Sequence, residues 1–178
     1  MTETSSAPSG LPVGAGHWVL DPAKSSANFS NKTIWGLVTV RGSFADLAGE
    51  GDVGADGSVS GVLRVGASSV NTKNKKRDQH LRSADFFDAG AHPHITFSAK
   101  DARLDESGNL AVSGDLEAGA TSRPLSLTAK VSEASADSVT LTASADVDRA
   151  DFGMTWNQMG MLKGPATVSI TARFTRQA

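Results

Sequence analysis

The chain has 178 residues and a formal net charge of −2, and this length suits one domain with a sizeable core. Its 17 basic and 19 acidic residues nearly balance, and the one basic cluster, Lys73 to Arg77, is short, so we expect no nucleic-acid partner. The absence of cysteine excludes disulfides, thiolate nucleophiles and thiolate metal sites.

Residues 1–16 contain an early glutamate, no basic n-region and no apolar run of the kind that a secretory signal needs. We therefore expect a disordered tail over residues 1–16, a single domain over residues 17–178, and a cytoplasmic protein. No segment approaches the ~20 apolar residues of a membrane helix, so we expect no stable membrane insertion.

Apolar and polar residues alternate with a period of two along most of the chain, which predicts β-strands. Turns rich in Gly, Ser, Asp or Pro separate roughly eight to ten such segments. Two surround Trp18 and Phe29, and the others cover 38–44, 59–65, 95–99, 110–116, 125–131, 139–145 and 168–174. We predict an all-β fold, an up-and-down antiparallel barrel of about eight strands, because closing the sheet removes its exposed edges.

Small residues are frequent on the predicted inward face of these strands. They either leave room for a ligand inside the barrel or merely relieve crowding where strands bend, and the pattern leaves both readings open. These residues are Ala27, Gly42, Gly61, Ala99, Gly114, Ala129, Ala143, Ala145 and Ala172.

A charged helical segment interrupts the strands over about residues 72–88. Thr72 is the expected N-cap, and helical spacing places Asp78 beside Arg82 and Arg77 beside Leu81. After this helix, Phe86 and Phe87 offer two aromatic rings to the barrel.

The stretch from Val70 to Phe97 resembles the central signature of the YceI-like family of polyisoprenoid-binding, lipocalin-like proteins. The resemblance is carried by Asn71-Thr72, Arg77-Asp78, His80-Leu81-Arg82-Ser83, Asp85-Phe86-Phe87-Asp88 and Pro93-His94-Ile95-Thr96-Phe97, and it extends over about residues 17–175. Trp18 to Phe29 are similar to the family's opening strand, and Arg149, Asp151, Phe152 and Gly153 to its R.DFG element. This resemblance implies a polyisoprenoid ligand, such as a quinone tail or a prenyl phosphate, inside a lipocalin-like barrel.

We therefore expect a non-catalytic protein that holds a long isoprenoid chain for transport, storage or sequestration, without a cofactor. The expected ligand-binding residues are Phe29, Trp35, Val40, Phe44, Leu63, Phe86, Phe87, Phe97, Leu116, Leu127, Leu141, Phe152, Met154, Trp156, Met161 and Ile170. Arg77, His80 and Arg82 are expected to contact a polar head group, because a cation or imidazole can bind a phosphate or quinone oxygen.

Other patterns favour competing hypotheses. His80 with Asp78 or Asp85 would suit a small enzyme acting on an apolar substrate, although no nucleophile stands in a familiar arrangement. His92 and His94 flank Pro93 without a third ligand nearby, so no metal site is expected.

The segment between the last two predicted strands has two expected roles. Arg149 and Asp151 are expected to form a buried ion pair that holds this loop. The apolar run Met154–Leu162 predicts either a flexible mouth over the ligand or a contact between the subunits of a homodimer, and both remain open.

Overall fold

The structure is a computed structural model that describes residues 13–177, except for the side chains of Gln158 and Lys163. The tail expected over residues 1–16 therefore lies, up to residue 12, outside the described residues. The strands are β1 (Gly16–Leu20), β2 (Ser26–Thr33), β3 (Val38–Phe44), β4 (Leu47–Val53), β5 (Val59–Gly66), β6 (Val70–Asn71), β7 (His94–Leu104), β8 (Asn109–Ala118), β9 (Thr121–Ser132), β10 (Ser138–Val147) and β11 (Lys163–Arg176). One α-helix, α1 (Lys75–Arg82), and four 3₁₀ turns, η1 (Pro22–Lys24), η2 (Ala67–Ser69), η3 (Arg149–Phe152) and η4 (Gln158–Gly160), complete the described elements.

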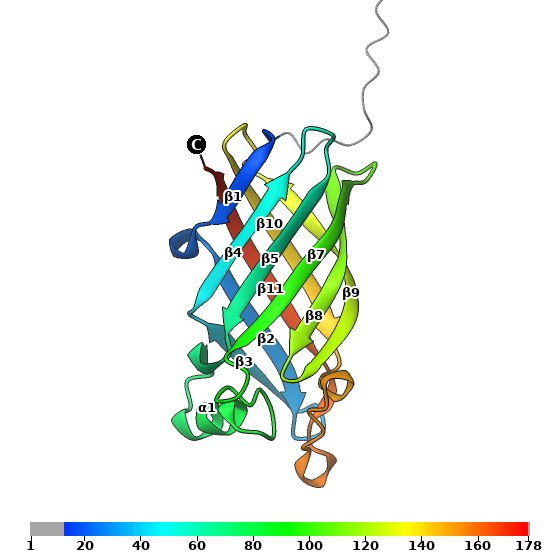
Figure 1. Cartoon of the computed structure of the whole chain (residues 1–178). Coiled ribbons are helices and arrows are strands. Elements are labelled where there is room, and N and C mark those ends of the chain that lie inside the picture. Colours follow the sequence, from blue (N-terminus) through cyan, green and yellow to red (C-terminus); the bar gives the residue numbers. More distant parts are fainter. Residues whose placement is uncertain (1–12, 178) are drawn as a thin grey trace, which may run out of the picture.

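The strands close into an antiparallel barrel (Figure 1). Hydrogen-bonded neighbours follow the order β1, β4, β5, β7, β8, β9, β10 and β11, and β11 pairs back with β1 to close a ring of eight. The N-terminal half of β11 pairs with β2, and β3 pairs with β2, so the β2–β3 hairpin extends the wall at one end. The predicted all-β, up-and-down barrel is confirmed.

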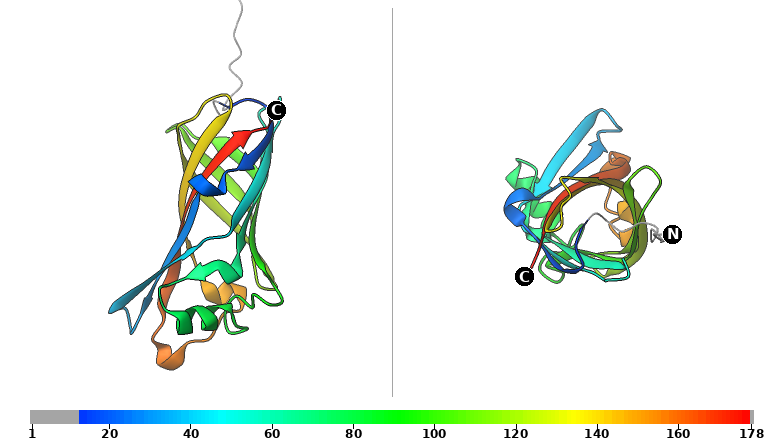
Figure 2. Two further views of the ribbon diagram at one scale, coloured as in Figure 1. Left: turned by 90° about the vertical axis from the view of Figure 1, so that its left-hand side faces the viewer. Right: turned by 90° about the horizontal axis from the view of Figure 1, so that it is seen from above.

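The β2–β3 hairpin leaves the ring at the end where α1 lies (Figure 2). There β3 pairs with β2 and, through Ser43 and Phe44, with the short strand β6. The strand that precedes β6 in the chain, β5, pairs with β4 and β7 rather than with the hairpin. The segment from β6 through α1 therefore lies beside the point where the ring and the hairpin separate, and it helps to close this end of the barrel.

The start of α1 differs from the prediction of a Thr72 cap. Asn74 is the N-cap, and its side-chain oxygen accepts a hydrogen bond from the N–H of Arg77 at 3.0 Å. Lys73 has a positive φ of 65°, a left-handed conformation that cannot continue into a right-handed helix, so α1 begins only after it.

Thr72 instead belongs to a buried polar pair with Asp78. The Asp78 carboxylate accepts from the Thr72 N–H at 2.9 Å and from its hydroxyl at 2.5 Å. Asp78 and Arg82 lie one turn apart on α1, as expected, but they have different partners, because Asp78 turns inward while Arg82 donates to the carbonyl oxygen of Ser68 at 2.9 Å.

Candidate functional site

The barrel encloses an internal cavity of about 350 Å³ whose wall is formed almost entirely by apolar side chains. Its lining begins at Val13 and Trp18 near the N-terminal end of β1 and ends at Phe87, Phe152 and Met154, near α1. This volume falls within the range of about 300–1,000 Å³ typical of small-molecule sites. The barrel therefore has room for an apolar ligand.

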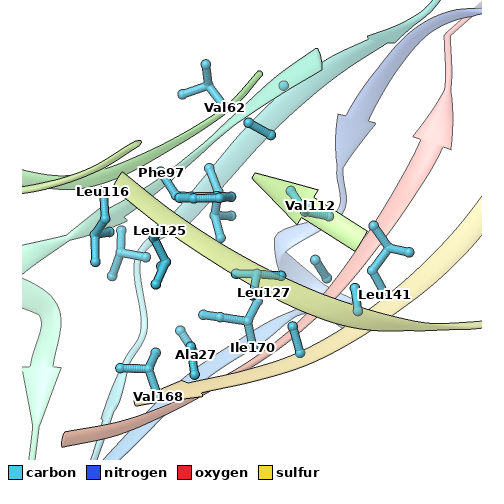
Figure 3. A pocket seen from close by; sticks show the side chains of 18 of the residues that line it. Ala27, Val62, Phe97, Val112, Leu116, Leu125, Leu127, Leu141, Val168 and Ile170 are labelled. Atoms are coloured by element: carbon cyan, nitrogen blue, oxygen red, sulfur yellow. The ribbon is translucent and has the colours of Figure 1, made fainter. Parts of the chain in front are cut away.

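The alternation of side chains along each strand determines which residues line the cavity. Along β10, Leu141 and Ala143 face the cavity while the intervening Thr142 is exposed. Figure 3 shows Phe97, Leu127 and Ile170, from β7, β9 and β11, directed toward a common interior. The period of two along each strand thus gives the closed sheet an apolar inner surface and a polar outer one.

The small residues serve both purposes that their pattern left open. Ala27, Gly61, Ala99, Ala129, Ala143, Ala145 and Ala172 line the cavity, where their short side chains leave space. At Gly114, in contrast, a Cβ would lie 2.0 Å from the carbonyl oxygen of Ser98, beside the bulge in β7. At Gly42 it would lie 2.4 Å from the ring of Phe29, so these two glycines relieve crowding.

An apolar cluster closes the cavity at the α1 end. Buried Ala118, Phe152 and Met154 pack with Phe86 and Phe87. Phe87 also lies edge-on to Phe44, with ring centroids 5.7 Å apart, which ties the α1 segment to β3. Side chains from the 72–93 segment and from the β10–β11 loop thus meet over this mouth.

Arg149 holds the β10–β11 loop, but not through the expected ion pair with Asp151. Its Nη1 donates to the carbonyl oxygens of Met154, at 2.6 Å, and Trp156, at 2.7 Å. No ion pair to Asp151 exists among the described residues, since Asp151 is exposed and the carboxylate of Asp148 instead accepts from the N–H of Ala150. The expected pair is therefore wrong, because the loop offers carbonyls at closer range.

Arg149 is also a cavity-lining residue that was not among the expected ligand contacts. Burial lowers its pKa, and the neighbouring Asp148 carboxylate acts in the opposite direction. Its position directly after a strand and before an apolar loop was the sequence signal for such a role.

Most of the expected ligand-binding residues surround the cavity. They are Phe29, Phe44, Leu63, Phe87, Phe97, Leu116, Leu127, Leu141, Phe152, Met154 and Ile170.

The other five expected residues, Trp35, Val40, Phe86, Trp156 and Met161, are not among the cavity-lining side chains. Trp35 is 53% exposed in the β2–β3 turn, and its N–H donates to the carbonyl oxygen of Met161 at 3.1 Å. Phe86 packs against Trp156, with ring centroids 5.6 Å apart, and Val40 is half-buried in β3. Ligand contact by these five stays a prediction.

The three expected head-group residues also lie outside the cavity lining. Arg77 donates to the hydroxyl and the carbonyl oxygen of Thr72, both at 2.8 Å, and Arg82 donates to the carbonyl of Ser68. His80 Nε2 lies 2.8 Å from a carboxylate oxygen of Asp85. Among these contacts, only that of Arg82 ties α1 to the preceding η2 turn, and a role of these three residues in head-group binding stays a prediction.

Within residues 13–177, no group of three His, Cys, Asp or Glu side chains has the geometry to hold a metal ion. In the same part of the chain, no helix has the length and apolar character needed to cross a membrane. His92 is half-buried and His94 exposed, on either side of Pro93.

Solved structures share this fold. BcnA of Burkholderia cenocepacia superposes with a TM-score of 0.77 at 16% identity, over 86% of this chain and 98% of that one. A polyisoprenoid-binding domain from Saccharophagus degradans, implicated in plant cell wall breakdown, gives 0.71 at 16% identity, over 90% and 98%. A YceI protein of Campylobacter jejuni gives 0.66 at 22% identity, over 80% and 88%.

Curated relatives include UPF0312 proteins of Staphylococcus aureus, which are 38% identical over 86 residues. This alignment covers 47% of the chain and 50% of the relatives, so the chain spans about half the length of the curated relatives that it matches. The YceI-like domain model matches residues 18–175. The chain therefore belongs to the YceI-like family.

Proposed function

We propose that this protein binds a long apolar isoprenoid chain inside its barrel and acts without catalysis, as a carrier, store or sequestering protein. The observation that carries the proposal is the apolar cavity, whose wall runs from Trp18 to Met154. Burial of each CH₂ contributes ~0.8 kcal/mol, so several isoprene units would give tight binding without a hydrogen bond. The description of the Saccharophagus degradans neighbour as polyisoprenoid-binding supports this ligand class.

The charged groups around the cavity support binding rather than catalysis. Glu50 and Asp52 border the cavity in β4, but their side chains are exposed and both lie near His17. His80, on which the alternative of a small enzyme depends, is not among the lining residues and is engaged by Asp85. A general acid or base must reach the substrate, whereas the side chains of Glu50 and Asp52 are exposed and His80 does not line the cavity.

Arg149 supports a polar ligand end at the α1 side of the cavity. Among the described residues, only its Nη1 makes hydrogen bonds, so Nε and Nη2 remain available to a ligand oxygen. A guanidinium binds phosphate or carbonyl oxygens through such parallel donors. A prenyl phosphate or a quinone would both satisfy this chemistry. The cytoplasmic location and the homodimer expected from the sequence belong to the same proposal.

Native mass spectrometry of the purified protein, followed by solvent extraction of the bound lipid, tests the proposal. A stoichiometric isoprenoid adduct is the expected result. An apo mass that stays unchanged when prenyl lipids are added would refute it.

Two matched substitutions on β10 locate the ligand. Ala143→Phe fills the cavity and should abolish the adduct, whereas Thr142→Phe places the same ring on the exposed face and should leave it intact. Equal binding by both variants would place the ligand outside the barrel.

A further inference from the structure

Large apolar side chains are exposed at one place on the described surface, in two neighbouring turns. They are Ile34, Trp35, Leu37 and Val38 in the β2–β3 turn, and Trp156 and Met159 in the β10–β11 loop. Leu37 is 82% exposed and Met159 is 75% exposed. Scattered exposed apolar residues are ordinary, but a group of six at one end marks an interaction surface. We call these six residues the apolar tip.

The backbone holds the apolar tip in a defined shape. The Trp35 N–H donates to the carbonyl oxygen of Met161, which joins the two turns. Ile34 and Trp35 have positive φ angles of 50° and 52°, a conformation that is costly for a β-branched residue such as isoleucine. Strain of this kind persists where the surrounding structure imposes it, and it is concentrated at functional sites.

The apolar tip lies at the end of the barrel where α1 helps to close the cavity, and none of its six side chains lines that cavity. Both turns lie at the same end of the barrel as α1 in the two side views (Figures 1 and 2). Phe152 and Met154, which close the cavity, precede Trp156 and Met159 in the same loop. A surface that binds this tip would therefore lie at the same end of the barrel as this mouth.

Several lysines lie near the apolar tip, although Asp146 lines the same surface pocket as Lys32. Residues 33–38 and 154–162 contain no charged residue, while Lys32 and Lys163 stand at the bases of the two turns and are paired in register. Lys73, Lys75 and Lys76 are exposed on the α1 segment at the same end. None of these three lysines belongs to an ion pair within the described part of the chain.

We propose that the apolar tip docks on an anionic lipid bilayer. Leu37 and Met159 enter the acyl boundary, Trp35 and Trp156 lie at the headgroup level where indoles concentrate, and Lys32, Lys73, Lys75 and Lys76 approach anionic headgroups. A second copy of the chain fits this surface less well, because a two-fold contact would bring the lysines of both copies together. This inference rests on the proposed function, because docking would serve the exchange of an isoprenoid between the bilayer and the cavity.

Flotation with lipid vesicles and tryptophan fluorescence test the proposal on the full chain. Vesicles of phosphatidylcholine with phosphatidylglycerol should bind the protein and shift its emission to the blue, and vesicles of phosphatidylcholine alone should bind it less. Trp18 is buried, so the shift should come from Trp35 and Trp156 and should diminish in Trp35→Phe and Trp156→Phe.

The variant Leu37→Asn/Met159→Asn should weaken vesicle binding by about tenfold or more, because it removes inserted apolar surface. Both side chains are mostly exposed, and asparagine tolerates the positive φ of Met159, so the fold should persist. Lys32→Glu should weaken binding by about fivefold or more, whereas Lys130→Glu, an identical charge change on β9, should have little effect.

Absence of binding to anionic vesicles, or binding that Leu37→Asn/Met159→Asn leaves unchanged, would overturn the proposal. A dimer seen by analytical ultracentrifugation that this variant dissociates, without lipid binding, would assign the tip to a second copy. The isoprenoid adduct provides an independent readout. If the adduct persists while vesicle binding fails, only the docking inference is lost, and if the adduct is absent, the proposed function is lost as well.

Discussion

The imidazole of His80 lies edge-on to the indole of Trp156, with ring centroids 4.4 Å apart. This contact joins α1 to the β10–β11 loop, the two segments whose side chains meet over one mouth of the cavity. Phe86 packs against the same two rings, at 5.1 Å from His80 and 5.6 Å from Trp156. The three rings therefore connect α1 to the β10–β11 loop at this end of the barrel.

His80→Ala should loosen this mouth without unfolding the protein. Aromatic pairs contribute about 0.5–1.5 kcal/mol beyond burial, so we expect a loss of about 1 kcal/mol or less and faster ligand dissociation. Stopped-flow displacement of a fluorescent prenyl probe measures the rate, and His94→Ala, which removes an exposed histidine at the start of β7, is the control. An enzyme that uses His80 would instead lose turnover while its ligand dissociation rate stayed constant.

Asp78→Ala should destabilise the protein by about 3 kcal/mol, because it leaves the buried N–H and hydroxyl of Thr72 without their acceptor. Urea denaturation monitored by circular dichroism measures the change. Glu106→Ala, in the exposed β7–β8 turn, should cost less than about 0.5 kcal/mol. Equal losses in the two variants would show that the Thr72–Asp78 pair contributes little.

Arg149→Ala should release the β10–β11 loop, because the carbonyl oxygens of Met154 and Trp156 both lose their donor. We expect a loss of about 2 kcal/mol and faster amide hydrogen exchange over residues 154–162. Asp151→Ala should leave the loop protected, since Arg149 binds carbonyls rather than this carboxylate. If Asp151→Ala opened the loop as strongly, an Arg149–Asp151 ion pair would have to exist in solution.

Hydrogen bonds from the hydroxyl and then the N–H of Ser58 lower the pKa of Asp56 in the β4–β5 turn below its ordinary value. A carboxyl with a lowered folded-state pKa contributes stability above its unfolded pKa and loses that contribution as the pH falls through the folded value. Ser58→Ala should therefore raise the pKa of Asp56 toward its ordinary value, as NMR titration of this carboxyl would show. An unchanged titration curve would mean that the Ser58 hydroxyl does not bind Asp56.

The barrel and its apolar interior could be predicted from the sequence because both follow from local periodicity. On β10, alternation alone places Leu141 and Ala143 inside and Thr142 outside, and the structure confirms this. Strand pairing then closes eight of the strands into a ring, so the inward faces meet around one cavity.

The mouth could not be predicted in this way, because irregular segments have no period and their contacts come from distant strands. Phe86 and Phe87 are neighbours, yet Phe87 lines the cavity while Phe86 packs on His80 and Trp156. Trp35 is exposed because the β2–β3 hairpin leaves the ring.

The sequence by itself thus determined the strand pattern, the apolar inner face and the family, since these depend on residue type and spacing. Only the tertiary structure decided which side chains close the cavity, what Arg149 holds and where the exposed aromatic residues gather. Those features depend on where the chain turns after each strand ends, and a single positive φ at Lys73 is enough to move the start of α1.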